Sequence, residues 1–247
     1  TGLPFLSLAV PGTGPREQFA LLDYFLRHRI RPARALVIGV DEYWCRPEPD
    51  MPVWLPFPFW LYDPDPLRYL GGLVRDQSLD DAAKRVGWAL GWSRRKRARP
   101  DGYWNYDEGF VWRAERLATF FAVRAPSTIA NETGRFPALD ALAARLDALP
   151  GDLPVILLRP PVAENALPAP GSALARSEAA CLAATRRVAA GGPNRALLDW
   201  RVDRPELRVP ENFIDPTHAR SPVARLVEAD LAAALAALRP GGGAAPR

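Results

Sequence analysis

The sequence is poor in the residues on which metal sites, disulfide scaffolds and membrane spans depend. It has two cysteines, Cys45 and Cys181, and neither lies in a Cys-x-x-Cys or Cys/His pattern. A structural zinc site and a disulfide-rich scaffold are therefore not indicated. The two thiols can form one bond or stay reduced, which leaves the redox compartment open. No apolar run approaches the ~20 residues of a membrane-spanning helix. Gly-x-Gly-x-x-Gly and Walker A motifs are absent as well, and we expect neither a metal nor a cofactor.

Lysine is also scarce, and this affects how the high sequence pI of about 9.4 is interpreted. Only Lys84 and Lys96 are lysines among the 32 basic residues, and the formal net charge is +4. The one dense basic run is Arg94-Arg95-Lys96-Arg97, with Arg99 close behind. We interpret this run as a solvated loop, with contact to anionic lipid headgroups or to an acidic polymer as the alternative. Nucleic-acid binding is not expected, because no recognition motif accompanies the run.

The chain does contain enough apolar side chains for a folded core, since 48% of its residues are hydrophobic. Residues 3–10 (LPFLSLAV) and 35–40 (ALVIGV) are short apolar runs typical of buried strands. Between them, Pro15 opens a segment whose apolar residues recur at helical spacing. Strand, helix and strand in this order predict a βαβ unit, and hence a parallel sheet.

The same alternation returns in the second half of the chain. We predict strands at 154–158 and 196–200, a helix at 172–190 with Ser172 as its N-cap, and a last helix from Ser221. Further helices are expected near 79–90, 110–123 and 137–149. The predicted fold class is α/β, a three-layer α/β/α sandwich of the SGNH or flavodoxin-like kind around a central parallel sheet. It forms one domain over residues 1–239, followed by a disordered tail at 240–247.

Residues 42 to about 110 interrupt this alternation. Prolines alternate there with aromatic side chains, and the segment has too many prolines for a sheet interior and too many aromatics for a disordered linker. We predict an ordered insertion that lies over the carboxyl edge of the sheet. Tyr43, Trp44 and Trp104 are its candidate substrate-binding residues, because aromatic rings beside acidic groups stack on sugars. The alternatives are that these rings form the core of the insertion or that they line an acyl-chain pocket.

The chain has two histidines, His28 and His218, so there are few candidates for a general base. His28 ends a predicted helix among arginines, and we interpret it as a surface residue. His218 follows Asp215 by three residues, in a short loop before the last helix. In such a turn the carboxylate can accept the Nδ1–H of the imidazole and leave Nε2 to take a proton from a nucleophile. Asp215 and His218 are the candidate catalytic residues. The alternative is a turn-capping aspartate beside an incidental histidine.

The Asp215-Pro-Thr-His218 block, on the last loop before the last helix, resembles the final block of the SGNH (GDSL) hydrolase superfamily. Phe213-Ile214 before it and the long helix after it look most like the cell-envelope branches, which include polysaccharide O-acetyltransferase-like proteins. The resemblance implies that Asp215 and His218 are two members of a Ser-His-Asp triad. It also implies that the backbone N–H of Gly12 helps to form the oxyanion hole.

Asp41 departs from the pattern of that superfamily, because it stands where the family has an asparagine that donates to the oxyanion. An ionised Asp41 accepts hydrogen bonds and repels a developing oxyanion. If it points into the site, it is protonated, has another role or marks a divergent mechanism. The alternative is a carboxylate that caps the next turn.

The family's Gly-Asp-Ser nucleophile block has no counterpart, and no serine lies in a Gly-x-Ser-x-Gly setting. The order of the family's blocks places the missing serine upstream of Thr1, so this chain alone is expected to be inactive. The resemblance implies a serine esterase or O-acyltransferase that acts on an acylated envelope glycan or a similar ester. It also implies a periplasmic location, or a membrane anchor upstream of Thr1, with the cytoplasm as the other option. The competing function is a non-catalytic envelope protein that binds glycan or protein on a degenerate SGNH scaffold.

Overall fold

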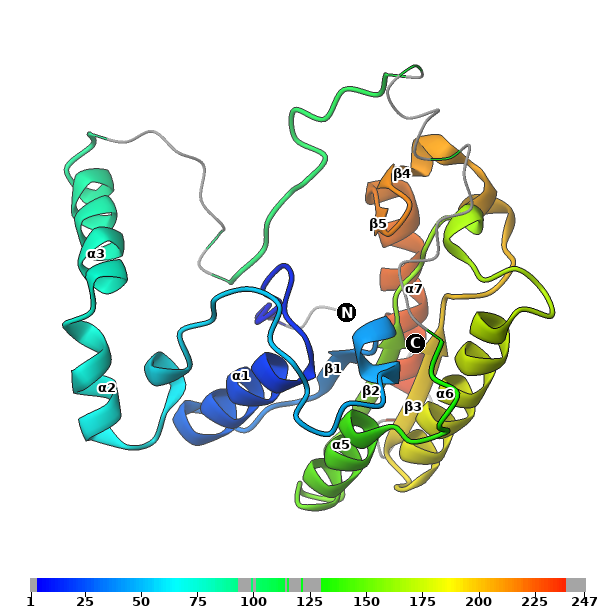
Figure 1. Cartoon of the computed structure of the whole chain (residues 1–247), viewed down its shortest axis with the longest axis horizontal. Helices are drawn as coiled ribbons and strands as arrows, with labels where there is room; N and C mark the ends of the chain where they lie inside the picture. Colours follow the sequence, from blue (N-terminus) through cyan, green and yellow to red (C-terminus); the bar gives the residue numbers. More distant parts are fainter. Residues whose placement is uncertain are drawn as a thin grey trace, which may run out of the picture. The chain divides into compact units, whose positions relative to one another are not determined.

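The computed structural model describes residues 4–92, 99, 101–113, 115, 121 and 130–238. These residues form two compact units (Figure 1). Of these described residues, the first unit contains 32–51, 106–113, 115, 121 and 130–238, and the second contains 4–31, 52–92, 99 and 101–105. A single domain over residues 1–239 stays a prediction, and the predicted tail at 240–247 lies outside the described residues.

A small parallel sheet forms the centre of the first unit, in the strand order β1-β2-β3. Its strands are β1 (Leu36–Gly39), β2 (Val155–Arg159) and β3 (Arg195–Asp199). The middle strand is the most buried of the three, and its Ile156 and Leu157 are fully buried. The predicted α/β class and the parallel pairing are confirmed, as are the three strands expected near 35–40, 154–158 and 196–200.

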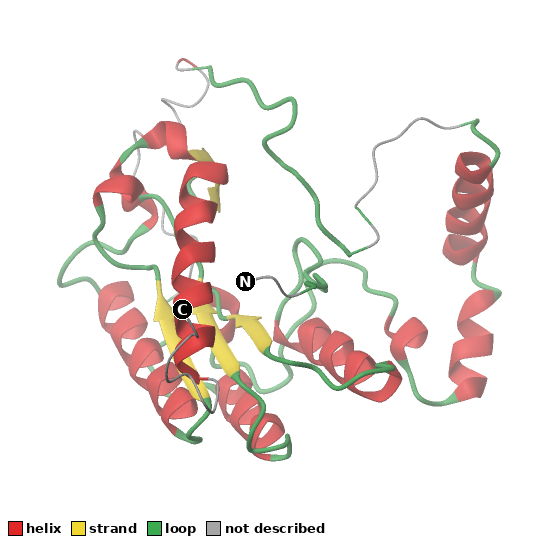
Figure 2. Ribbon diagram, turned by 180° about the vertical axis from the view of Figure 1, so that it is seen from behind, coloured by secondary structure: helices red, strands yellow, loops and turns green. Residues whose placement is uncertain are grey.

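Three helices of the first unit occur where the helical spacing predicts them. They are α5 (Pro137–Asp147), α6 (Ala173–Ala190) and α7 (Ser221–Leu238). The side chain of Ser172 accepts a hydrogen bond from the backbone N–H of Ala175 and caps α6, as expected. Both α6 and α7 pack against β2 and β3, and α7 passes in front of the sheet in Figure 2.

The connections of the first unit contain short 3-10 helices and a hairpin. The hairpin consists of β4 (Phe213–Asp215) and β5 (His218–Ala219), which pair antiparallel. The 3-10 helices are η1 (Glu42–Cys45), η3 (Glu164–Ala166), η4 (Pro205–Arg208) and η5 (Pro210–Asn212).

The two cysteines form a disulfide bond, which resolves the question that the sequence leaves open. Cys45 of η1 and Cys181 of α6 have their Cα atoms 5.4 Å apart, and both side chains are buried. Asn131 supports the same junction: its side-chain amide donates to the carbonyl of Cys45 at 3.0 Å, and its backbone N–H donates to Ser177 Oγ at 2.8 Å. The 3-10 turn that follows β1 is therefore held against α6.

The strand predicted at residues 3–10 does not form. Residues 4–10 lie in a loop, and Phe5 keeps 67% of its surface exposed. The backbone of this loop contacts Asp101, whose carbonyl accepts from Ser7 N–H, and the following turn, where the carbonyl of Val10 accepts from Thr13 N–H. An apolar run becomes a strand only where a neighbouring strand accepts its ladder, and the described residues supply none here. The βαβ unit expected over the first 40 residues is therefore wrong in its first strand.

The second unit consists of helices joined by aromatic loops. Its elements are α1 (Pro15–His28), η2 (Phe59–Tyr62), α2 (Pro66–Leu73) and α3 (Asp76–Ala89). The helix predicted near 79–90 is confirmed as α3, whereas the helix predicted over 110–123 lies mostly outside the described residues. Helix α2 packs on η2 through Gly72, where an added Cβ would lie 2.0 Å from the ring of Trp60.

Candidate functional site

The Asp215-Pro-Thr-His218 turn joins β4 to β5 and brings its two titratable side chains together. His218 Nδ1 lies 2.9 Å from Oδ1 and 2.8 Å from Oδ2 of Asp215. Oδ1 also accepts from the backbone N–H groups of Thr217 at 2.9 Å and His218 at 3.1 Å. An aspartate that accepts from the backbone two residues later is the usual organiser of such turns, and proline presets the next position. The local sequence therefore orients the imidazole.

Apolar packing and a backbone hydrogen bond attach the β4–β5 hairpin to the rest of the first unit. The carbonyl of Pro216 accepts from the N–H of Ala163, in the loop after β2, at 2.8 Å. At the base of the hairpin, Phe213 is fully buried. Its cluster contains Ala163, Trp200, Leu207, Val223 and Val227. The turn that carries the histidine is thus anchored on the same body as β2, β3 and α7.

The two charges stabilise each other. Burial opposes ionisation of Asp215, but the hydrogen bonds from His218 and Thr217 outweigh it and lower the pKa of Asp215 to about 2. The hydrogen bond to Asp215 raises the pKa of His218 above its usual 6.5 against partial burial, and the charge of Glu42 raises it further. Near pH 7, Asp215 is ionised and accepts from Nδ1–H. The neutral form of His218 then carries its lone pair on Nε2.

The Nε2 edge of His218 is open to reactants. The side chain keeps 67% of its surface exposed, and within the described residues no group hydrogen-bonds to Nε2. An imidazole fixed at Nδ1 and open at Nε2 is arranged to exchange a proton with a bound hydroxyl group.

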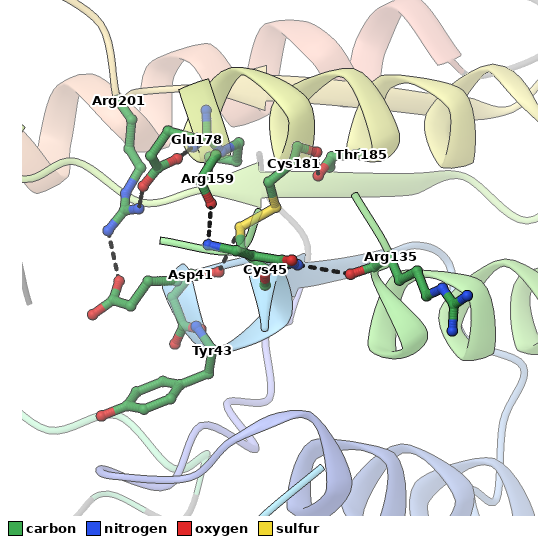
Figure 3. The surroundings of a disulfide bond; sticks show 12 residues. Asp41, Tyr43, Cys45, Arg135, Arg159, Glu178, Cys181, Thr185 and Arg201 are labelled. Carbon is green, nitrogen blue, oxygen red and sulfur yellow. Dashed lines mark hydrogen bonds and ion pairs between the residues drawn. A yellow bond between two sulfur atoms is a disulfide. The ribbon is translucent and has the colours of Figure 1, made fainter. Parts of the chain in front are cut away.

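A buried cluster of ion pairs lies where β1, β2 and β3 end. We refer to it as the strand-end cluster, and it consists of Glu42, Arg159, Glu178, Asp199 and Arg201. Glu178 of α6 binds both arginines, with Arg201 at 2.6 Å (Figure 3). Arg201 also reaches Glu42 at 2.6 Å, and Arg159 reaches Asp199 at 3.1 Å. Both arginine side chains are more than nine-tenths buried, with 4% and 8% exposed.

The strand-end cluster borders a pocket of about 120 Å³. Arg159, Glu178 and Arg201 supply its polar wall, whereas Leu167 and Leu182 are among its apolar lining residues. Since one water occupies about 30 Å³ in the liquid, the pocket has room for a small group with one polar end.

Asp41 and Glu42 follow β1 directly and enter the same region. Asp41 Oδ1 accepts from the N–H of Tyr43 at 3.0 Å and caps η1, which is the capping role that the sequence offers as the alternative. Burial, followed by the charge of Glu42, raises the pKa of Asp41 to about 7, against the Tyr43 hydrogen bond and the charge of Arg201. A large fraction of Asp41 is therefore protonated near neutrality.

The aromatic candidates lie in different environments. Trp44 is fully buried, so its ring belongs to the core, which argues against stacking on a substrate. Tyr43 is half-buried, with the guanidinium of Arg46 over its ring at 5.4 Å. Trp104 belongs to the second unit and is 38% exposed. For Tyr43 and Trp104 a role in substrate binding stays a prediction.

Gly12 also belongs to the second unit. It adopts the left-handed φ of +73° in the turn after Val10, and an added Cβ would lie 2.4 Å from the Leu55 side chain. The turn therefore requires glycine for its own geometry, and donation from Gly12 to an oxyanion stays a prediction. His28 is exposed near Tyr24, with ring centroids 4.4 Å apart.

Sequence reasoning missed the strand-end cluster, although a signal was present. Asp41-Glu42, Arg159 and Asp199-Trp200-Arg201 each stand at or just after the end of an apolar strand. Charged residues at the carboxyl ends of parallel strands meet at one edge of a sheet. Glu178, which links the two arginines, lies within α6 and carries no such signal.

Comparisons with family models, with curated proteins and with solved structures gave no match. Across the described residues, no group of histidine, cysteine and acidic side chains is arranged to hold a metal ion. Those residues also include no helix with the length and apolarity required to cross a membrane.

Proposed function

We propose that the first unit carries the base half of an acyl-transfer site, in an SGNH-like serine esterase or O-acyltransferase that acts on an acylated envelope glycan or a similar ester. The observation that carries this proposal is the contact of His218 Nδ1 with both carboxylate oxygens of Asp215. That contact leaves Nε2 as the proton acceptor.

In the proposed reaction, Nε2 of His218 takes the proton of a serine hydroxyl as the serine oxygen attacks the acyl carbonyl. The serine is the nucleophile that the SGNH resemblance implies. Asp215 stabilises the resulting imidazolium, which returns the proton to the leaving alcohol as the ester bond breaks. Water or an acceptor hydroxyl then takes the acyl group from the serine by the reverse proton transfers. The first route gives hydrolysis, and the second gives transfer to a glycan.

The oxyanion formed in this reaction needs hydrogen-bond donors. The N–H of Gly12 is one candidate donor, and a protonated Asp41 is the other, because a carboxylic acid carries an O–H where the family's asparagine carries an N–H. The raised pKa of Asp41, about 7, supports this second role. The pocket of about 120 Å³ beside the strand-end cluster has room for a short acyl group such as acetyl.

We further propose that the sheet and its helices form a three-layer α/β/α sandwich and that the protein resides in an oxidising compartment. A three-layer sandwich is supported by α6 and α7, which both pack on β2 and β3, with α7 in front of the sheet and α6 behind it in Figure 2. An oxidising compartment such as the periplasm is supported by the disulfide between Cys45 and Cys181, because disulfides seldom persist in a reducing cytosol.

The test is hydrolysis of p-nitrophenyl acetate by the full-length gene product. His218→Gln is expected to lower kcat by at least about 10³-fold, because no base then accepts the serine proton. His28→Gln is the matched control, since it removes the other histidine, and it should leave kcat unchanged. In the unsubstituted protein kcat should rise with pH as His218 becomes neutral. In Asp215→Asn the rise should move to lower pH, because the hydrogen bond and charge that raise the pKa of His218 are lost.

Full activity in His218→Gln would overturn the proposal. A full-length protein that cleaves no ester but binds an envelope glycan would instead support the non-catalytic alternative.

A further inference from the structure

The pocket beside the strand-end cluster has one polar wall and one apolar wall. Arg159, Glu178 and Arg201 form the polar wall. The apolar residues come from α6 and from the segment between β2 and α6, and they are Val162, Ala166, Leu167, Pro168, Ala179 and Leu182. At about 30 Å³ for each water in the liquid, a pocket of about 120 Å³ holds roughly four non-hydrogen atoms. The pocket therefore fits a small group with a polar side and an apolar side.

The polar wall contains a hydrogen-bond donor and hydrogen-bond acceptors. Arg201 donates from its two Nη atoms to Glu178 and Glu42, but its Nε–H is buried and has no acceptor among the described residues. A buried N–H without an acceptor is unfavourable, and a ligand that accepts from it removes that penalty. The two carboxylate oxygens of Glu178 accept from Arg201 and Arg159, one each (Figure 3). Since a carboxylate oxygen has two lone-pair sites, each can also accept from a ligand.

The charge of the strand-end cluster favours a neutral ligand. Its three carboxylates and two guanidinium groups leave a formal charge of −1 when all five are ionised. That net charge repels an anion, whereas a cation in the pocket would face the two arginines of the polar wall. A neutral group that carries both a donor and an acceptor avoids both repulsions.

An acetamido group has this size and these features, with a methyl carbon, a carbonyl carbon, an oxygen and a nitrogen. Its oxygen can accept from the Nε–H of Arg201, and its N–H can donate to Glu178. Its methyl group can pack on Leu167 and Leu182. The acetyl group of an ester lacks the N–H, and the hydroxyl group of a sugar lacks the methyl. Both would leave part of the pocket without a partner.

We propose that this pocket binds the acetamido group of an N-acetylated amino sugar, so that the substrate is a glycan that contains such sugars. The inference rests on the proposed function for the choice of a glycan. The pocket adjoins the segment to which the histidine turn is attached. Val162 of the apolar wall precedes Ala163, whose N–H donates to the carbonyl of Pro216 at 2.8 Å. A sugar held in the pocket therefore borders the attachment of the turn.

The experiment measures the binding of two neutral trisaccharides to the purified chain by isothermal titration calorimetry. Triacetylchitotriose carries an acetamido group on each ring, and cellotriose carries a hydroxyl group at the same position. Triacetylchitotriose is expected to bind at least about tenfold more tightly, because cellotriose lacks the methyl contact and the hydrogen bonds of the amide. This comparison uses the unsubstituted chain and depends on no variant.

Ala179→Phe tests whether the pocket is the binding site. Ala179 is an exposed residue of α6 that lines the pocket, so a larger ring there fills space in the pocket without displacing a buried side chain. It should lower the affinity for triacetylchitotriose at least about tenfold. Ala190→Phe is the matched control, because Ala190 is an exposed alanine at the end of the same helix and lies outside the pocket lining. It should bind as the unsubstituted chain does.

Thermal unfolding curves of the two variants will show whether the fold is kept, and Ala179→Leu takes the place of Ala179→Phe if the larger ring lowers the unfolding temperature. No binding of either trisaccharide, equal binding of both, or an equal loss in the variants at positions 179 and 190 would each overturn the inference. Those results leave the esterase test of His218→Gln unaffected. Selective binding of triacetylchitotriose together with full esterase activity in His218→Gln would overturn the proposed function and keep the pocket.

Discussion

At the scale of single residues, Asp41 combines two requirements that conflict. Its carboxylate caps η1 by accepting from the N–H of Tyr43, which favours the ionised form. Burial and the neighbouring charge of Glu42 favour the protonated form, and they prevail, so the pKa rises to about 7. The loss of folding stability that a buried, ionised Asp41 causes therefore depends on pH. It is absent while Asp41 is protonated and grows as the carboxyl is forced to ionise.

Asp41→Asn tests this directly, because asparagine also caps helices but carries no charge. An unfolded aspartate titrates near 3.9. The native state holds its proton up to about pH 7, so the native protein loses stability relative to the unfolded chain as the pH rises between those values. We expect Asp41→Asn to match the unsubstituted protein at pH 4 and to exceed it on the order of 1–3 kcal/mol at pH 8. Thermal unfolding followed by circular dichroism across this range is the measurement.

The matched control for Asp41→Asn is Asp65→Asn, at the N-cap of α2, where the side chain is 46% exposed and accepts from Leu67 N–H. It reports the exchange of a capping carboxylate for an amide at an exposed position, without the burial of Asp41. A constant difference between Asp41→Asn and the unsubstituted protein over the whole range would contradict the assignment.

At the scale of elements, the strand-end cluster connects segments that are far apart in sequence. Arg201 follows β3 and binds both Glu178 of α6 and Glu42 of η1. A buried ion pair adds little net stability when it is complete, since desolvation offsets the attraction. Removal of one partner is costly, because it leaves a charge without compensation in a region of low polarity.

Arg201→Met is therefore expected to lower the free energy of unfolding by about 3–5 kcal/mol, measured by urea denaturation at pH 7. Arg208→Met is the control, because Arg208 pairs with Asp203 at the surface and the two side chains are 53% and 64% exposed. That change should cost much less than Arg201→Met does, because an exposed ion pair contributes little to stability. If Arg201→Met and Arg208→Met lost the same free energy of unfolding, burial would not determine what each ion pair contributes to stability.

The helices and strands also show how much of the fold the pattern of neighbouring residues predicts. Strands β1, β2 and β3 and helices α5, α6 and α7 follow from apolar runs and helical spacing, because those signals come from adjacent residues. The run at residues 3–10 carries the same strand signal and yet forms a loop, since pairing depends on a neighbour that local sequence does not specify. The Asp215–His218 contact was predictable because the two residues share one turn. The contacts of Arg201 were not, because its partners Glu42 and Glu178 come from two other segments.

At the scale of the whole molecule, the disulfide is a long-range covalent link, with a sequence separation of 136 between Cys45 and Cys181. It holds η1 and α6 together, which respectively carry Glu42 and Glu178 of the strand-end cluster. Residues 52–105 of the second unit lie within the loop that it closes. In the chain-entropy account, a loop of this length reduces the freedom of the unfolded chain by about 5 kcal/mol.

We therefore expect the free energy of unfolding of the double variant Cys45→Ala/Cys181→Ala to be about 2–5 kcal/mol lower than that of the oxidised protein, as measured by urea denaturation. Alanine at both positions leaves no unpaired thiol, so the loss reports the cross-link together with two small packing defects. Cys45→Ala alone separates these contributions, because it already breaks the bond and should lose nearly as much. Thiol titration of the unfolded, unreduced protein provides the independent check. Two free thiols per chain, or equal stability of the double variant and the oxidised protein, would show that the bond does not constrain the fold.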